Sequence, residues 1–352
     1  MKYGYWTPIF GGWLRNVENE NMPATFDYVK KVAQNAEKLG YDMTLIPELF
    51  LNDIKGIEDP TMDAWSTTAA LAAVTEKLQL LTAIRPGFYN PATLAKTAAN
   101  IDHISNGRFS LNIVSAWWQE EARQYGGIFT EHDERYARTE EFIEVLKGLW
   151  TQTPYSFKGK FYDYKNTYLS PKPLRDNHIP LYAGGESEAG RQSIAETCDS
   201  YVMHGGTIAE IGEKIADMKR RREELGKEPF ETFGLAAYII LRDTEEELEA
   251  ELTRIQNVQE GSPGYAGYKD FVSKSQLNVN VSLEDYSVSN RGLRPQLIGT
   301  AEQIAKQILA YEEVGVNLLI LQFSPQLEEM ERFATQVFPV VEKLRAQKVG
   351  VN

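Results

Sequence analysis

Short apolar runs of strand length alternate with stretches of helical periodicity along most of the chain. Strands are predicted at residues 3–10, 43–47, 78–84, 109–116, 179–183, 201–204, 233–241 and 318–323. Helical stripes follow them, as in residues 25–39, which Gly40 ends. A strand followed by a helix, eight times over, predicts an α/β fold, a (β/α)8 TIM barrel with insertions. A doubly wound sheet is the alternative, which the lack of a GxGxxG pattern after any predicted strand weakens.

The length of 352 residues would suit two average domains, but single barrels with insertions often exceed about 250 residues. We therefore expect one barrel domain over residues 1–352 with two insertions. Residues 155–170 are predicted to form a hairpin. Residues 257–296 hold Gly, Ser, Asn and Tyr with little periodicity, which is typical of an active-site lid or a disordered loop.

Composition removes several classes of function. The formal net charge of −13 argues against a nucleic-acid surface, which requires a basic stripe. No stretch has the length and apolarity of a membrane span, and the N-terminus shows no signal-peptide pattern. The lone cysteine, Cys198, excludes an internal disulfide, and no pair of histidines has zinc-ligand spacing. We expect a cytoplasmic protein that binds no metal, membrane or nucleic acid.

The strand predicted at residues 109–116 has one bulky apolar face and one small, partly polar face. Asn112 lies on the second face, which would line a narrow barrel near a ligand. Because an unpaired buried amide costs on the order of a few kcal/mol, either a backbone network or a ligand must satisfy it. The next helix carries Arg135 and Tyr136 in its first turn. A cation there opposes the helix dipole, which indicates an anionic ligand.

A second candidate anion site is the turn Gly184-Gly185-Glu186-Ser187, between the strand predicted at residues 179–183 and a helix. Glycines allow close backbone approach, and the N–H groups at a helix N-terminus favour an anion. Ser187 can add a hydroxyl. A structural N-cap after a flexible turn would have the same sequence, so the turn alone does not distinguish an anion site from a structural N-cap.

Two patterns frame these residues: Asn-Gly-Arg-x-x-x-Asn-x-Val-x-x-Trp from Asn106, and His-x-Glu-Arg-Tyr from His132. Together they resemble the bacterial luciferase-like flavin monooxygenases, nearest the two-component alkanesulfonate and dimethylsulfone monooxygenases and the pyrimidine oxygenase. The likeness covers nearly the whole chain and is weakest at residues 257–290. It implies a flavin-dependent monooxygenase that uses FMN as FMNH2, with O2, to oxygenate a small organosulfur substrate, an alkanesulfonate or a sulfone.

The resemblance also implies a set of cofactor contacts. Residues of the family that hold the flavin match Asn112, Glu121, Arg135, Tyr136 and Ser187, although Glu120 stands next to Glu121 and a slip of one position would exchange them. Matches to Glu48 and Leu49 lie beside the flavin ring. The ring is expected over the ends of the third and fourth strands, where Thr82 and Ala83 are small enough to lie under it. Glu186 belongs to the expected phosphate turn.

Three residues are candidates for the chemistry: His132, Arg291 and Tyr238. His132 belongs to the matched pattern, and Arg291 matches an arginine on a mobile loop that closes over the sulfonate in alkanesulfonate monooxygenases. A solvated loop arginine is an equal reading of Arg291. Tyr238 and Ala236 stand where that family has histidine and arginine, which weakens the sulfonate assignment and favours the dimethylsulfone type with its neutral substrate.

Other readings stay open. A deazaflavin-dependent dehydrogenase on the same barrel would transfer a hydride without O2. A glycosidase-type hydrolase would use paired carboxylates such as Glu48 and Glu121, and a flavin-binding protein without catalysis is also compatible. No nicotinamide site is visible in the sequence, so a monooxygenase would need a separate NAD(P)H:flavin reductase. Relatives are oligomers, which implies a homo-oligomer here.

Overall fold

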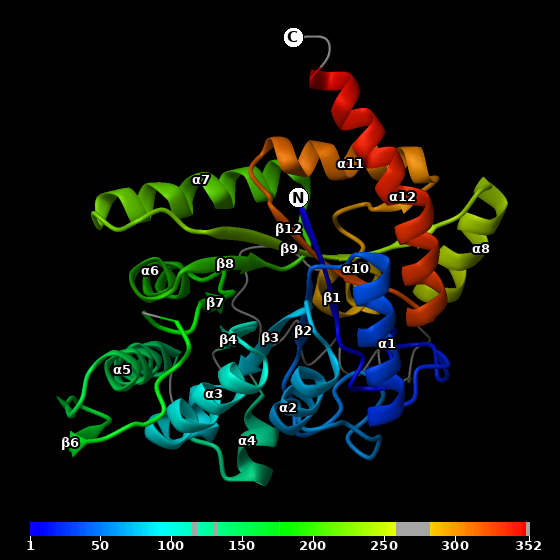
Figure 1. Ribbon diagram of the computed structural model, residues 1–352. Helices are drawn as coiled ribbons and strands as arrows, with labels where there is room; N and C mark the ends of the chain where they lie inside the picture. Colours follow the sequence, from blue (N-terminus) through cyan, green and yellow to red (C-terminus); the bar gives the residue numbers. More distant parts are fainter. Residues whose placement is uncertain (115–117, 130–131, 176, 258–281, 350–352) are drawn as a thin grey trace.

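Eight parallel strands close into a barrel within the part of the chain that the structure describes (Figure 1). The structure is a computed structural model, and it describes residues 1–114, 118–129, 132–175, 177–257 and 282–349, without the side chains of His132, Asp133 and Val349. In order around the barrel, the strands are β1 (Lys2–Trp6), β12 (Leu318–Gln322), β9 (Thr232–Tyr238), β8 (Ser200–Met203), β7 (Leu181–Ala183), β4 (Phe109–Ile113), β3 (Gln79–Ile84) and β2 (Met43–Ile46). The predicted TIM barrel is confirmed, and an open sheet is excluded.

Helices form a ring outside the barrel, each packed against the next and the last against the first. They are α1 (Phe26–Leu39), α2 (Ala64–Val74), α3 (Pro91–Ile104), α5 (His132–Thr151), α6 (Glu188–Thr197), α7 (Ile208–Glu224), α11 (Ala301–Glu313) and α12 (Gln326–Val349). Their ends follow local rules. The Asn90 side chain caps the first turn of α3 with Pro91 behind it, and Gly40 ends α1 at a φ of 87°.

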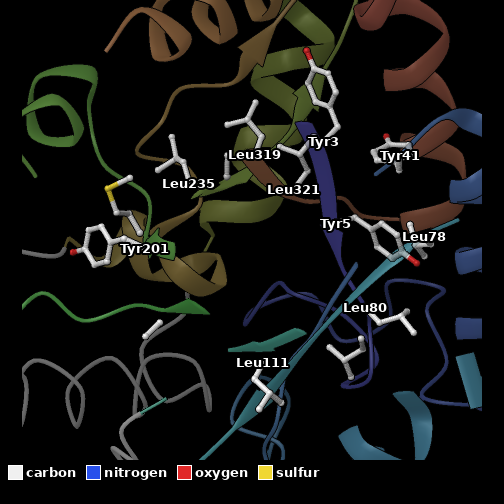
Figure 2. Close-up of a cluster of buried hydrophobic side chains, with 14 of the residues drawn as sticks. Tyr3, Tyr5, Tyr41, Leu78, Leu80, Leu111, Tyr201, Leu235, Leu319 and Leu321 are labelled. Atoms are coloured by element: carbon white, nitrogen blue, oxygen red, sulfur yellow. The ribbon is translucent and has the colours of Figure 1, made fainter. Parts of the chain in front are cut away.

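Strand alternation divides the apolar residues into two cores. The larger core lies between the strands and the helices, and Figure 2 shows part of it, including Tyr5, Leu80 and Leu111. A smaller core fills the barrel itself, formed by Met43, Leu45, Leu81, Tyr182, Leu318 and Ile320. Leu80 and Leu81 therefore point to opposite sides of β3, as a period of two requires.

The barrel interior becomes polar towards the carboxyl ends of the strands. Asn112 pairs in register with Ala83 and with Tyr182, so it shares their inward face, as its place in the alternation predicted. Gln322 pairs with Tyr238 in the same way across β12 and β9. In barrels of this kind the loops at this end carry the ligand sites, and these side chains lie at that end.

The two expected insertions differ in structure. β5 (Tyr155–Lys158) and β6 (Asp163–Thr167) form an antiparallel hairpin. Of the segment 257–296, residues 258–281 lie outside the described part of the chain. The part from residue 282 is folded: α10 (Leu283–Ser287) and the 3-10 turn η2 (Ser289–Arg291) lead into the chain before β11 (Ile298–Gly299). We call residues 282–296 the cover segment; this part of the expected lid or disordered loop contains defined elements.

The cover segment lies against the carboxyl end of the barrel. The backbone N–H of Tyr238, the last residue of β9, donates to the Gly292 carbonyl at 2.8 Å, and the Gly205 N–H after β8 donates to the Asn290 carbonyl at 3.0 Å. The predicted strand 233–241 is divided accordingly: β9 belongs to the barrel, whereas β10 (Ile240–Leu241) leaves it and pairs with β11.

No helix in the described part of the chain is long and apolar enough to cross a membrane.

Gly184, directly after β7, provides a test of the packing at this end of the barrel. A Cβ added there would lie 2.6 Å from the Val202 carbonyl oxygen, which is backbone and cannot rotate away. Gly184→Ala should therefore lower the free energy of unfolding by about 1–3 kcal/mol. Urea denaturation at neutral pH measures this change.

Gly212→Ala is the matched control, because that glycine lies within α7 and its added Cβ would meet Val314 at an ordinary 3.6 Å. This variant should be neutral or more stable than the wild type by up to about 1 kcal/mol. Equal destabilisation by both changes would show that the contact after β7 is not tight.

Candidate active site

A cluster of ion pairs lies where the turn after β7 meets the cover segment. The Glu186 carboxylate lies 2.7 Å from the Arg291 guanidinium and 2.7 Å from the Lys214 ammonium of α7. The side chains of Arg291 and Glu186 are only 7% and 9% exposed. Burial by itself would raise the pKa of Glu186, but His204 and the cationic side chains of Arg291 and Lys214 lower that pKa to about 2. Glu186 is therefore ionised at neutral pH, and its charge is compensated by the protein's own Arg291 and Lys214.

His204 lines the space beside this cluster. It follows Met203 at the end of β8, and its side chain is accessible to solvent. The protein nevertheless surrounds the imidazole deeply enough that desolvation, followed by the charge of Arg291, lowers its pKa to about 4. The ring is thus neutral near pH 7 and faces the open end of the barrel as an uncharged hydrogen-bonding group.

The glycine-rich turn after β7 and the N-terminus of α6 pack against Tyr136. Ser187 is the N-cap of α6, and its hydroxyl accepts from the Gly190 N–H at 3.1 Å and donates to the Tyr136 hydroxyl at 3.4 Å. A Cβ at Gly190 would lie 2.7 Å from the Tyr136 hydroxyl, so only glycine allows this approach. The structure thus brings together Tyr136 and Ser187, two of the residues expected to hold the cofactor, and Arg135 precedes Tyr136 on α5.

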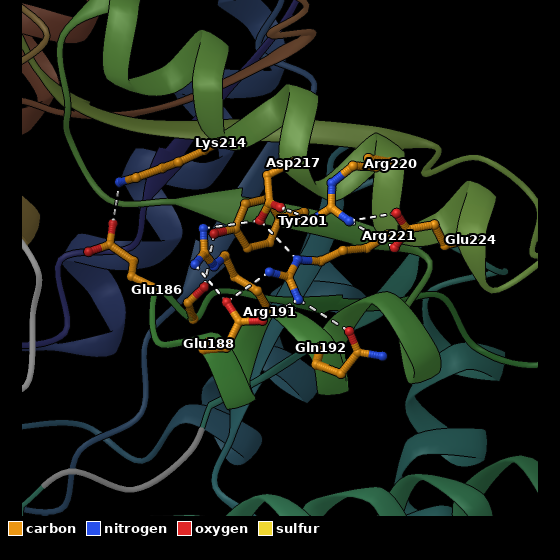
Figure 3. A network of polar contacts seen from close by, with 11 residues as sticks. Glu186, Glu188, Arg191, Gln192, Tyr201, Lys214, Asp217, Arg220, Arg221 and Glu224 are labelled. Atoms are coloured by element: carbon orange, nitrogen blue, oxygen red, sulfur yellow. Dashed lines mark hydrogen bonds and ion pairs between the residues drawn. The ribbon is translucent and has the colours of Figure 1, made fainter.

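Helix α6 is fixed in place by a network of ion pairs to α7 (Figure 3). Arg191 of α6 lies 3.0 Å from Asp217 of α7, and Arg221 of α7 lies 2.8 Å from Glu188 of α6. These pairs hold the N-terminus of α6, and with it Ser187, against the barrel. Pairs at partly exposed positions contribute modestly one by one, and here they act as a network.

Asn112 has a buried acceptor that the protein does not satisfy. The residue is 6% exposed, and among the described residues its Oδ1 has no hydrogen-bond partner. A small side chain, Ala83, is its neighbour on the inward face. An unsatisfied oxygen beside a small residue at the strand ends fits a planar ligand that carries N–H donors. The backbone network considered as an alternative partner for this oxygen is absent from the described residues.

Arg85, at the end of β3, forms the centre of a separate buried cluster. Its guanidinium is 2% exposed and pairs with both Glu48 and Glu121. The rings of Phe50 and Phe88 lie 5.1 and 4.4 Å from it. We call these five residues the Arg85 clamp. It joins the chain after β2, the chain after β3 and α4 (Gln119–Tyr125). These segments line the opening at the carboxyl end of the barrel, on the side of β2 and β3; we call this opening the mouth.

The clamp changes the role expected for Glu121. The residue is fully buried, and its carboxylate binds Arg85 and accepts from the Phe50 N–H at 2.5 Å. Its oxygens therefore have partners within the protein, and the structure assigns the carboxylate a role in holding Arg85 and the chain at Phe50. Glu120 does not replace it, because that side chain is exposed and pairs with Arg123.

Glu48 is the residue of the Arg85 clamp that can exchange a proton near neutral pH. Its Oε2 accepts from the Arg85 N–H at 3.0 Å, and its Oε1 accepts from the Tyr89 hydroxyl. Burial raises the pKa of Glu48 to about 7, although Arg85 and Tyr89 act to lower it. A carboxyl that titrates near neutrality can hold or release a proton under working conditions. Leu49, next to it, is half-buried at the edge of the main core.

Four more residues were expected at the site: Thr82, Glu186, Tyr238 and His132. Thr82 was wrongly assigned, because its hydroxyl lies 2.7 Å from that of Thr68 on α2 and so faces the helices. The Glu186 carboxylate is directed at Lys214 and Arg291, which leaves only the backbone of this residue to the turn. Tyr238 is 1% exposed beneath the cover segment. The side chain of His132 lies outside the described residues.

Sequence reasoning missed Arg85 and Lys214. Arg85 stands in an ordinary Arg-Pro-Gly turn, and its partner Glu121 is 36 residues away along the chain. The only local signal was a cation directly after a buried strand, at the end where barrels place their ligands. Lys214 lies within a helix rich in charged residues, where nothing in the sequence marks one lysine among several.

Comparison with known proteins adds to this geometry. The family model described as luciferase-like monooxygenase matches residues 1–318. The chain is 34% identical to an FMNH2-dependent dimethylsulfone monooxygenase of Pseudomonas putida, over 99% of this chain and 97% of that one. It is also 34% identical to the protein of that description from Pseudomonas fluorescens strain Pf0-1, over 99% and 96%.

Among solved structures, the chain is similar in fold to a long-chain alkane monooxygenase, with a TM-score of 0.80 and 19% identity over 97% of this chain and 91% of that one.

The raised pKa of Glu48 predicts a pH-dependent stability. Because the folded protein binds this proton more tightly than the unfolded chain, the protonated form stabilises the fold fully below pH 4.5, and this is lost as pH rises to about 7. Glu48→Gln cannot titrate. Relative to wild type, its free energy of unfolding should rise by on the order of 3 kcal/mol between pH 4.5 and 8.

Glu120→Gln serves as the control, since this exposed carboxyl has its pKa lowered by Arg123 and does not titrate in that range. Its unfolding curve should stay parallel to that of the wild type between pH 4.5 and 8. Parallel curves for Glu48→Gln as well would mean that Glu48 is ionised throughout.

Proposed function

This chain belongs to the luciferase-like monooxygenase family, and we propose that it uses reduced FMN and O2 to oxygenate a small neutral organosulfur compound, a sulfone. One oxygen atom enters the substrate and the other leaves as water, while FMNH2 gives up two electrons and two protons to become FMN. The curated relatives reported above act with FMNH2 and on dimethylsulfone by their names.

The ion pair between Glu186 and Arg291 is the observation that favours a neutral substrate over an anionic one. A sulfonate would need an unpaired cation at the mouth, and a guanidinium suits it best. Arg291 is already paired with Glu186 at 2.7 Å. Arg294, the other arginine of the cover segment, is paired with Asp285 and Glu210. With both guanidinium charges neutralised, an uncharged sulfone is the better match.

The site fits FMN at two places. The turn at Ser187, with the N-terminus of α6, Tyr136 and Arg135, would take the phosphate, since backbone N–H groups, hydroxyls and a cation favour an anion there. Asn112 and Ala83 would lie against the ring system, where the free Oδ1 can accept from a ring N–H. Reduced FMN would supply the electrons and the activation of O2 that no side chain can supply.

The protein would position the reactants, exclude water and handle protons. The cover segment closes part of the mouth from the side of β8 and β9, which limits the water that reaches the reacting atoms. Glu48, with its pKa near 7 and its bond to Tyr89, can hold a proton near neutral pH. His204 stays neutral there and can donate or accept a hydrogen bond without adding charge.

Partners follow from the same proposal. The chain would work with a separate NAD(P)H:flavin reductase that delivers FMNH2, in the cytoplasm, where such reductants are available. We further propose a homo-oligomer. A deazaflavin-dependent dehydrogenase is the competing function, and it would neither consume O2 nor accept FMNH2.

The phosphate assignment can be tested with two cofactors. Ser187→Ala and Arg135→Ala should each weaken FMN binding by about 1–3 kcal/mol, because each removes a hydrogen bond or a charge at the phosphate. Riboflavin, which lacks the phosphate, should bind the variants and the wild type with similar affinity. Titration followed by flavin fluorescence measures both. Equal losses for the two flavins would exclude a phosphate contact.

The proposed function is tested by a substrate panel. The purified protein is mixed anaerobically with FMNH2, then with O2 and either dimethyl sulfone or methanesulfonate, and oxygenated product is measured per FMN formed. The wild type should oxygenate the sulfone and leave the sulfonate. Turnover of neither sulfones nor sulfonates would refute the proposed substrate class.

Glu186→Gln extends the panel by releasing Arg291 from its pair. This variant should bind methanesulfonate more tightly than the wild type does, by about tenfold or more, since one charge-assisted interaction becomes available. Glu210→Gln is the matched control, because the neighbouring Arg294 keeps its pair with Asp285 when Glu210 is replaced, so this variant should bind methanesulfonate as the wild type does. A Glu186→Gln variant that still ignores the sulfonate would remove the ion pair as the reason for selectivity.

A further inference from the structure

Two uncharged side chains inside the barrel have hydrogen-bonding groups that the described protein does not use. Trp6 ends β1 and packs on the inner core beside Leu45, its partner in register. Gln322 ends β12. Because Tyr5 pairs with Leu321, Trp6 and Gln322 are the next neighbours across β1 and β12. Both therefore point into the barrel at its carboxyl end.

The indole of Trp6 is the first of these groups. Its Nε1 is buried and has no acceptor among the described residues. Two other buried indoles show the usual arrangement: Trp13 donates to Gln326 at 3.0 Å, and Trp150 donates to the Ala95 carbonyl at 3.1 Å. An indole N–H can only donate, and on the inner face of the barrel its acceptor can be supplied by a bound ligand.

The amide of Gln322 is the second group, and it can exchange the positions of its oxygen and nitrogen by a flip. The residue is fully buried, its Nε2 donates to the Ser289 hydroxyl of the cover segment at 2.7 Å, and its Oε1 has no partner among the described residues. The amide oxygen and nitrogen are interchangeable in shape, and a hydroxyl can donate as well as accept. With Ser289 donating to the amide oxygen, Gln322 would present its NH2 to the barrel interior.

We propose that Trp6 and Gln322 form an uncharged pair of donors that binds the two oxygens of a neutral sulfone. A sulfone has two acceptors and no donor, so it selects the orientation in which Gln322 turns its NH2 inward. Trp6 donates to one oxygen and Gln322 to the other. Ser289, which fixes the amide, belongs to the cover segment, so that segment sets the specificity of the site as well as covering it. This inference rests on the proposed function.

The test compares dimethyl sulfone with dimethyl sulfide, which has a similar carbon and sulfur skeleton but no oxygen acceptor. Trp6→Phe keeps a ring and removes the donor, and Gln322→Leu removes the amide. Each should raise KM for the sulfone about tenfold, the size of one lost hydrogen bond, with kcat changed less than about twofold. Binding of each compound to the full chain, followed by ligand-observed NMR, should show the sulfone weakened and the sulfide unaffected.

Trp65→Phe is the matched control. Its indole N–H also lacks a partner among the described residues, but it lies on α2, with its ring against Phe109 on the outer side of the barrel wall. This variant should bind both compounds as the wild type does.

The proposal is overturned if Trp6→Phe and Gln322→Leu bind the sulfone as Trp65→Phe does, or if sulfone and sulfide lose affinity equally, which would mean a packing effect. The NMR comparison decides this even if the wild type oxygenates no sulfone. In that case the proposed function fails, while a selective loss of sulfone binding would still support the donor pair.

Discussion

The ion pair between Glu186 and Arg291 connects the two halves of the site. Glu186 stands in the turn that would bind a phosphate, and Arg291 stands in the cover segment over the barrel mouth, 2.7 Å away. Because both side chains are nearly buried, removing Glu186 would leave the Arg291 charge uncompensated, which is far costlier than losing an exposed pair. The pair therefore holds the cover segment against the turn, and it takes away the positive charge that an anionic substrate would need.

The rest of the mouth is arranged around the same balance of charge. On the opposite side, the Arg85 clamp places one guanidinium between the carboxyl groups of Glu48 and Glu121. Burial of Glu48 outweighs the opposing effect of Arg85, and the pKa of Glu48 is raised to about 7. Near pH 7 the His204 ring and the Asn112 amide are neutral, whereas the Glu48 carboxyl titrates and can exchange a proton.

Much of the fold could be predicted from the sequence, because each barrel strand is a short apolar run with a period of two. The inward position of Asn112 follows from that period alone. The same rule should have excluded Thr82, since it and Ala83 are adjacent and cannot both face inward. Glu121 could not be assigned in this way, because its partner Arg85 is distant in sequence and only the fold brings them together. The turn at Ser187 was recognisable because its signals are local.

We propose that this barrel inserts an oxygen atom from O2 into a neutral sulfone with electrons from reduced FMN. The most direct measurement is isotopic: the protein, FMNH2 and dimethyl sulfone react under ¹⁸O2, and the product is analysed by mass spectrometry. We expect one labelled oxygen atom per product molecule and one FMN formed per product. An unlabelled product, or a reaction that proceeds equally well without O2, would refute the proposed oxygen insertion.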